Sequence, residues 1–302
     1  MTEAHAFLSL QGRSVMSAGC CRLCSSLLVF WTLLILPGTP AQARDWWTVR
    51  HPTAGPPQAV GSPAAGCLAG GVALPLEGPG YQVVRASRER YFGHPRLIRY
   101  IRDLGRQIVG STLDTVYVGD LSQPRGGPMS YGHASHQNGL DVDIWLTPGR
   151  PLMQPARLRE TIDVPSVVTA DGTAIVRTVW SNGHARLISL AARPPEVDRI
   201  FVHPAIKREL CRTAGGNRDW LHKVRPWRGH SAHFHVRLAC APGEKDCLPG
   251  RPLPPGDGCD EMDHYFNGPG RALLPLPKEL PPGHRPPRVA LPESCTGVVK
   301  AP

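Results

Sequence analysis

Apolar and polar residues alternate strictly in two short segments that lie far apart in the chain. In residues 140–146 every second side chain is apolar, and the positions between them hold two carboxylates and an indole. In residues 233–238 apolar positions alternate with two imidazoles and a guanidinium. A period of two predicts β-strands with one apolar and one polar face. The apolar faces would consist of Leu140, Val142, Ile144, Leu146, Phe234 and Val236, and the polar faces of Asp141, Asp143, Trp145, His233, His235 and Arg237. If the two strands are neighbours, their polar faces line one site.

A longer period marks residues 95–108 as a helix. Apolar residues recur there at the spacing of one helical face, at Leu97, Ile98, Ile101, Leu104 and Ile108, and Pro95 is suited to the first turn. Weaker patterns predict strands at 115–118 and 199–202, a strand or the end of a hairpin at 173–180, and helices at 185–192, 204–211 and 261–266. His94 and His203 each precede a proline at a helix start, which favours a structural hydrogen-bonding role.

The two flanks lack such periods. Residues 46–80 are rich in proline and glycine, and we expect them to be irregular. Residues 273–302 indicate an extended, proline-rich tail anchored by Cys295. No internal repeat is found, and the site would be built from distant segments. These patterns predict one α+β domain over residues 44–272, with a central antiparallel sheet that carries the site and long irregular arms.

The N-terminus has the pattern of an export signal. Arg13 and Arg22 precede an apolar run at residues 27–36, and a small-x-small cleavage site follows at residues 41–43. We therefore expect residues 1–43 to be removed and the protein to act in the periplasm. The apolar run is short for a membrane span, so no stable membrane insertion is expected after cleavage, although an uncleaved anchor is the alternative.

Charge and cysteines agree with export. The chain has a formal net charge of +10, which favours polyanionic partners in general. Export argues against nucleic acid as the partner, and a generally soluble basic surface explains the charge equally well. Three of the nine cysteines lie in the signal segment. The other six form an even set in an exported chain, which indicates disulfides, and spacing alone does not choose the pairs.

The polar faces carry the ligand types of a catalytic zinc site. Imidazole and carboxylate ligands hold such an ion and leave one position open for water. His136 lies just before the first strand, Asp143 lies within it, and His235 lies on the second strand. We expect these three residues to bind one Zn²⁺ per chain. Asp141 shares a face with Asp143, and spacing alone does not separate the two.

The segments around these residues resemble the penicillin-insensitive murein endopeptidase family. This family belongs to the lysostaphin, D-Ala-D-Ala carboxypeptidase and Hedgehog group of zinc peptidases. The strongest similarity lies in residues 130–145 (SYGHASHQNGLDVDIW) and 224–238 (VRPWRGHSAHFHVRL). Shorter similar stretches are residues 90–95 (RYFGHP), 201–204 (FVHP) and 256–259 (GDGC). The resemblance extends from about Cys67 to Cys259 and onward to Cys295.

This resemblance implies roles for individual residues. His136, Asp143 and His235 match the zinc ligands, and His233 matches the catalytic histidine. His133 and His230 match further active-site histidines, of which we place His230 with the catalytic residues and His133 near substrate. Asp141 would orient a ligand histidine from behind. The resemblance also implies three disulfides, Cys67–Cys295, Cys211–Cys259 and Cys240–Cys247.

The function implied is hydrolysis of the peptide cross-bridges of peptidoglycan, of the D-alanyl to diaminopimelate type. A water nucleophile requires no serine to acylate, so such an enzyme would be insensitive to penicillin. Two alternatives stay open. One is a zinc D,D-carboxypeptidase or wall amidase on the same scaffold, which would differ in pocket shape. The other is a non-catalytic, zinc-stabilised wall-binding module, against which an intact His233 beside the ligands argues.

Overall fold

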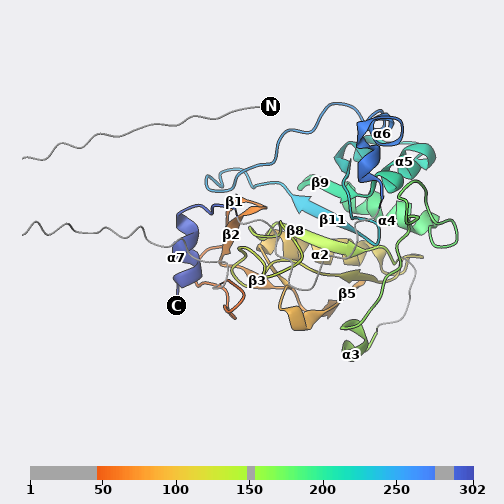
Figure 1. Ribbon diagram of the computed structural model, residues 1–302. Helices are drawn as coiled ribbons and strands as arrows, with labels where there is room; N and C mark the ends of the chain where they lie inside the picture. Colours follow the sequence, from red (N-terminus) through yellow and green to blue (C-terminus); the bar gives the residue numbers. More distant parts are fainter. Residues whose placement is uncertain (1–45, 148–153, 276–288) are drawn as a thin grey trace, which may run out of the picture. The chain divides into compact units, whose positions relative to one another are not determined.

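The two alternating segments form neighbouring strands in the middle of a sheet. The computed structural model describes residues 46–147, 154–275 and 289–302, and within them the sheet has seven strands in the order β10–β9–β11–β8–β7–β5–β4 (Figure 1). The strands at its centre are β8 (Asp141–Trp145) and β11 (His233–Leu238). The other strands of the sheet are β4 (Glu77–Gly78), β5 (Tyr81–Val83), β7 (Val116–Val118), β9 (Val197–Val202) and β10 (Val224–Pro226). The α+β class with an antiparallel centre is confirmed, although the β10–β9 and β5–β7 pairs are parallel.

The strand register confirms the two predicted faces. Strand β11 pairs antiparallel with β8, and it pairs antiparallel with β9 on its other side. His235 lies directly opposite Asp143, whereas Phe234 lies opposite Ile144. Polar residues therefore face polar residues across the pair, and apolar residues face apolar ones, as the period of two requires.

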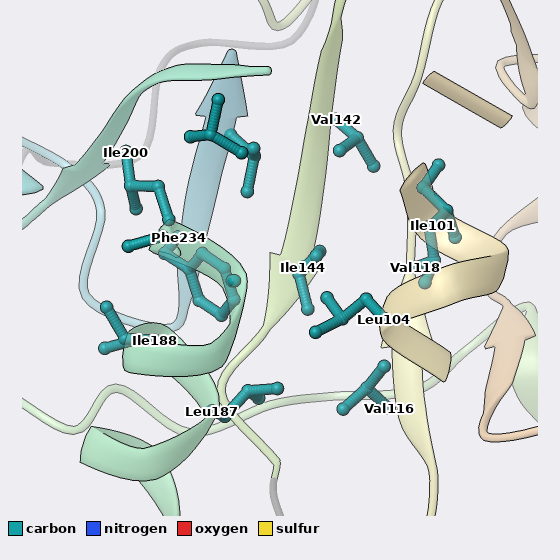
Figure 2. Close-up of a cluster of buried hydrophobic side chains, with 14 of the residues drawn as sticks. Ile101, Leu104, Val116, Val118, Val142, Ile144, Leu187, Ile188, Ile200 and Phe234 are labelled. Carbon is teal, nitrogen blue, oxygen red and sulfur yellow. The ribbon is translucent and has the colours of Figure 1, made fainter. Parts of the chain in front are cut away.

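Helices cover the apolar face of this sheet. Helix α2 (Pro95–Ile108) contributes the apolar residues that its sequence pattern assigns to the core, and helix α4 (Asn182–Ala192) adds Leu187 and Ile188. Figure 2 shows Leu104 of α2 and Ile188 of α4 in the same cluster as Ile144 of β8 and Phe234 of β11. All of these side chains belong to one buried cluster. The predicted helix at 95–108 is thus confirmed, and the helix expected at 185–192 begins three residues earlier.

Histidines cap the N-termini of two helices, α2 and α5 (Pro204–Thr213). The Nδ1 atom of His94 accepts the backbone N–H of Arg96 at the start of α2, and His203 accepts that of Ala205 at the start of α5. Both histidines have the structural role that the sequence favours. The remaining described helices are α3 (Ala156–Arg159), α6 (Met262–Phe266) and α7 (Ser294–Lys300), with 3₁₀ helices at Ala86–Arg88, Asp219–Lys223 and Pro269–Leu273. None of the described helices is long and apolar enough to cross a membrane.

The expectation of an irregular N-terminal arm is wrong. Residues 46–80 contain a two-stranded antiparallel sheet of β1 (Gln58–Ser62) and β2 (Ala65–Ala69), and β3 (Val72–Ala73) pairs with β6 (Phe92–Gly93). These strands are short and consist largely of alanine and glycine, so they carry almost no alternation. Tertiary contacts therefore decide their structure, as is common for β-strands.

The C-terminal arm is also more ordered than an extended tail. Residues Ser294–Lys300 form α7, which packs against β2. Cys295 and Val299 join Trp46, Val60 and Cys67 in a second, smaller apolar cluster. The guanidinium of Arg125 donates to the carbonyls of Val298, Val299, Ala301 and Pro302. Cys295 is therefore one of several attachments of this arm.

The strand expected at 173–180 does not form. A turn around Asp171 joins Val168 and Ile175 in a single antiparallel bridge, and the backbone then turns at Val176. This is the end of a hairpin, the second reading of that pattern. Among the described residues the disulfides are Cys67–Cys295, Cys211–Cys259 and Cys240–Cys247, the pairs that the resemblance implies. The expected signal segment lies outside the described residues.

Candidate metal centre

Three elements bring the predicted ligands together. Asp143 comes from the middle of β8, and His235 lies opposite it on β11. His136 comes from the loop that enters β8, where its backbone has a φ of 67°. Non-glycine residues rarely adopt this left-handed conformation, although histidine does so more readily than most. The His136 N–H donates to the Asp141 Oδ2 atom at 3.2 Å, which holds the loop in this conformation. All of these side chains are buried.

Imidazole nitrogens converge on the Asp143 carboxylate. The Nε2 atom of His136 lies 3.4 Å from Asp143 Oδ1, and the Nδ1 atom of His235 lies 3.2 Å from the same oxygen. The Nδ1 atom of His133 lies 3.4 Å from the other oxygen, Oδ2. Within the described part of the chain, His133, His136 and Asp143 form a group whose ligand atoms all lie within 4.8 Å of one another.

Several of these atoms are buried without a hydrogen bond. Among the described residues, both ring nitrogens of His136, Asp143 Oδ1 and His235 Nε2 have no hydrogen-bond partner. His235 Nε2 lies 3.2 Å from Asp141 Oδ2, yet its geometry is not that of a hydrogen bond. Burying an unpaired polar atom costs roughly 1–3 kcal/mol, so a cluster of such atoms indicates a missing partner.

The spacing of these atoms fits a tetrahedral metal ion. Zinc binds nitrogen and oxygen ligands at about 2.0–2.1 Å, so two ligands of a tetrahedral site lie roughly 3.3 Å apart. The distances of 3.4 Å and 3.2 Å to Asp143 Oδ1 agree with this separation. His136 and His235 therefore each lie at a ligand–ligand separation from Asp143 Oδ1, and all three side chains are donor types that zinc binds.

Burial and the neighbouring charges set the protonation of the cluster. Burial lowers the pKa of His136 to about 4, against the smaller opposing effect of Asp143. Burial would raise the pKa of Asp143, but His136, His233 and His133 hold that pKa well below its usual range. His136 is therefore neutral and Asp143 ionised near pH 7, the forms that bind a metal.

Asp141 lies behind His235, with its Oδ2 atom 3.2 Å from the outer nitrogen of that ring. Its two oxygens accept the Nε and Nη2 atoms of Arg237, both at 2.9 Å. Burial lowers the pKa of His235, but the carboxylates of Asp141 and Asp143 raise it to about 9. Asp141 is thus committed to Arg237 and to the backbone of His136, which leaves Asp143 as the carboxylate that faces the centre.

The other histidines form a wall beside the centre. His233 lies two residues before His235 on the same strand face, and its Nε2 atom is 3.7 Å from Asp143 Oδ2. The rings of His230 and His233 are 5.0 Å apart between centroids. Burial lowers the pKa of both rings, that of His230 to about 3. These two residues and His235 line a cavity of about 430 Å³ that opens beside the buried carboxylates.

Comparison with known proteins identifies the family. The family model described as penicillin-insensitive murein endopeptidase matches residues 59–300. A protein with that name from Yersinia enterocolitica is 48% identical over 246 residues, which cover 80% of this chain and 88% of the relative. Namesakes from Klebsiella pneumoniae and Haemophilus influenzae are 42% identical over 276 residues and 44% identical over 259 residues. These matches cover 91% and 84% of this chain, and 97% and 90% of the relatives. The chain belongs to this family.

In this member of the penicillin-insensitive murein endopeptidase family, every residue predicted for the site lies in or beside the one cluster. Asp143 and His136 are at its centre, and His235 and His133 approach opposite oxygens of Asp143. Sequence analysis missed Asp120. Its buried Oδ2 atom lies 3.1 Å from His133 Nε2, and it accepts Arg90 Nη1 at 2.9 Å and Arg88 Nη1 at 3.3 Å.

The environment of Asp120 explains how it supports His133. Burial would raise the pKa of Asp120, but His133, Arg90 and Arg88 hold it below its usual range. The ionised carboxylate therefore fixes the outer nitrogen of His133 while its inner nitrogen faces Asp143. The available signal was a carboxylate two residues after the end of the short strand predicted at 115–118.

Proposed function

We propose that this protein is a zinc-dependent murein endopeptidase that hydrolyses peptide cross-bridges of the D-alanyl to diaminopimelate type. One observation carries the zinc assignment: the buried, unpaired Asp143 Oδ1 atom has the unpaired His136 Nε2 atom at 3.4 Å and the His235 Nδ1 atom at 3.2 Å, the separation of neighbouring zinc ligands. The relatives' shared name supports the substrate, because it describes endopeptidases of murein.

Two histidines compete for the third ligand position. His133 belongs to the compact group with His136 and Asp143, but it approaches Oδ2 and its other nitrogen is engaged by Asp120. His235 approaches Oδ1, the oxygen that His136 also approaches. His136 and His235 thus flank the same carboxylate oxygen, whereas His133 flanks the other one. We therefore assign His136, Asp143 and His235 as the ligands, and His133 as a residue beside the metal.

The chain's own residues supply proton transfer and positioning. When bound, zinc polarises the scissile carbonyl and acidifies water at neutral pH. His233 lies about 7 Å along the strand from His235 on the same face, which suits a general base or acid that does not bind the metal. Burial keeps the pKa of the His233 ring low, so that it enters the reaction neutral and able to accept a proton. His230, beside His233, can pass a proton to the leaving amine or hold the substrate.

Export to the periplasm completes the proposal. The N-terminal pattern at residues 1–43 favours a cleaved signal, and three disulfides suit an oxidising compartment. Zinc and peptidoglycan are then the cofactor and partner of one site, and nucleic acid has no access to it.

Digestion of purified peptidoglycan tests the function. The mature protein, residues 44–302, should convert cross-linked muropeptide dimers to monomers, as identified by mass spectrometry. A chelator should abolish the reaction and added zinc should restore it, whereas penicillin should not affect it. Release of only a terminal D-alanine would instead indicate a carboxypeptidase. Separation of the stem peptide from the sugar would indicate an amidase, and binding without any cleavage would indicate a wall-binding module.

A further inference from the structure

A loop at the edge of the cavity carries a cation that no other described side chain uses. Residues 227–230 connect β10 to β11 and line the cavity together with His233 and His235. Arg228 is exposed, and only its backbone carbonyl has a hydrogen bond, which the Nδ1 atom of His230 makes at 3.1 Å. The other cation of the cavity, Arg237, is held by both oxygens of Asp141. Arg228 is therefore the cation available to a ligand.

The loop presents Arg228 in a fixed place. The backbone N–H of Trp227 donates to Val202 at 2.7 Å, and the carbonyl of His230 accepts the N–H of His203 at 2.8 Å. Gly229 between them has a φ of 85°, a conformation suited to glycine. Both ends of the turn are thus attached to β9 and the residue after it, so the position of Arg228 is defined relative to His230 and His233.

The surroundings of Arg228 suit an anionic peptide. No acidic side chain is among the described residues that line the cavity, whereas six of the lining residues are histidine or arginine. The Trp227 side chain is 59% exposed, and its ring packs edge-on against Phe201 with centroids 5.3 Å apart. An exposed indole held in this way offers a flat apolar surface beside the guanidinium.

We propose that Arg228 and Trp227 form a subsite for the carboxylate that neighbours the scissile amide, a proposal that rests on the function proposed above. In a cross-link to diaminopimelate, the carbon that carries the linked amine also carries a free carboxylate. Guanidinium pairs with carboxylate through two parallel hydrogen bonds, which fixes the orientation of the ligand as well as its charge. The indole covers the adjacent hydrocarbon chain. Arg228 thereby selects cross-links with an ionised carboxylate on the leaving-amine side.

Chemically defined muropeptide dimers test the subsite. Three dimers are compared: one with free carboxylates, one amidated at the diaminopimelate carboxylate next to the cross-link, and one amidated at the glutamate carboxylate. Each is assayed for KM and kcat with the wild type, Arg228→Gln, Arg228→Lys and the control Arg157→Gln, an exposed arginine away from the cavity. Dissociation constants are measured in parallel with a chelator present.

Amidation at diaminopimelate should raise the wild-type KM and Kd about 10-fold or more, the size expected for one charge-assisted contact. Arg228→Gln should raise both constants for the free acid by a similar factor and remove the discrimination, with a smaller change in kcat. Arg228→Lys should retain part of the discrimination between the free and the amidated dimer. Arg157→Gln should behave as the wild type.

The subsite would be overturned if Arg228→Gln still discriminated fully between the free dimer and the dimer amidated at diaminopimelate. It would also be overturned if the wild type responded instead to amidation at glutamate. If the wild type bound the free acid selectively but cleaved no cross-link, the proposed function would fail while the subsite stood. Cleavage of all three dimers without selectivity would leave the proposed function standing and overturn the subsite.

Discussion

The two faces of the β8–β11 strand pair both contain buried residues, but these residues are stabilised in opposite ways. On one face Val142, Ile144, Phe234 and Val236 are fully buried in the apolar core (Figure 2). Burial of such surface contributes about 25 cal/mol per Å². On the other face Asp141, Asp143 and His235 are also buried, but part of their polar atoms lack partners in the described chain. Burial of the apolar face therefore offsets the free-energy cost of burying unpaired polar atoms on the other face.

This difference separates residues that hold the fold from residues that do the chemistry, even where they are neighbours in sequence. Phe234 lies between His233 and His235, and Val142 lies between Asp141 and Asp143. Substitutions at adjacent positions should therefore give different kinds of defect. The apolar face should respond in the free energy of unfolding, and the polar face in metal content and rate.

The largest effect should come from His235→Ala, which removes a proposed ligand. We expect this variant to lose its zinc and, with it, all measurable cross-bridge hydrolysis. His133→Ala is the matched comparison, because the His133 ring lies beside the other oxygen of the Asp143 carboxylate. It should retain about one zinc per chain by metal analysis. The reverse pattern, with zinc lost only from His133→Ala, would assign His133 as the third ligand.

His233→Ala should separate proton transfer from metal binding on the same strand face. Removal of a general acid or base typically lowers the rate by about 10²–10⁴-fold. We expect a loss of this size in kcat for a muropeptide dimer, with the zinc content unchanged. A variant that lost its zinc would make His233 a ligand. A variant with a near-wild-type rate would remove it from the reaction.

Phe234→Ala should have the opposite character. Truncation of a fully buried phenylalanine typically costs about 3–5 kcal/mol in the free energy of unfolding. Denaturant titration should detect this loss, while zinc content and kcat, measured well below the unfolding transition, should stay close to those of the wild type. Val72→Ala is the control, because Val72 is partly exposed in a short strand and should change stability little. A selective loss of activity in a stable Phe234→Ala protein would contradict the division between the faces.

Asp120→Asn should have the smallest effect, because it acts on the centre through His133. The amide keeps an acceptor for His133 but loses the charge that faces Arg90. We expect kcat to fall by roughly 10-fold, in the range of substitutions that affect residues supporting metal-site histidines. In a His133→Ala background the same substitution should add little further loss. Equal losses in both backgrounds would mean that Asp120 serves the fold and not His133.

Strands β8 and β11 and their two faces could be predicted from the sequence, because the alternation of apolar and polar residues is a local pattern. Faces alternate at every second residue, so Asp143 and His235 could be placed on polar faces without knowledge of the fold. The contact between His133 and Asp120 could not be predicted in this way, because it joins two loops. The left-handed backbone of His136 depends on a hydrogen bond to Asp141 within the folded loop.

The arms show the opposite limit. Strands β1 and β2 are built from residues such as Ala59, Gly61 and Gly66, which have little intrinsic preference for a strand. Helix α7 contains Thr296, Gly297 and two valines, which favour helix weakly. Long-range attachments to Cys67 and Arg125 determine both elements, and no short window of sequence contains them.

The Cys67–Cys295 disulfide makes the catalytic segments part of a covalent ring. Its two cysteines are 228 residues apart, and the histidines and carboxylates of the site all lie between them. A single proteolytic cut anywhere in this interval opens the ring but releases no fragment. In an environment rich in proteases, a nicked molecule can therefore keep both site strands together, and the cut becomes visible as separate chains only after reduction.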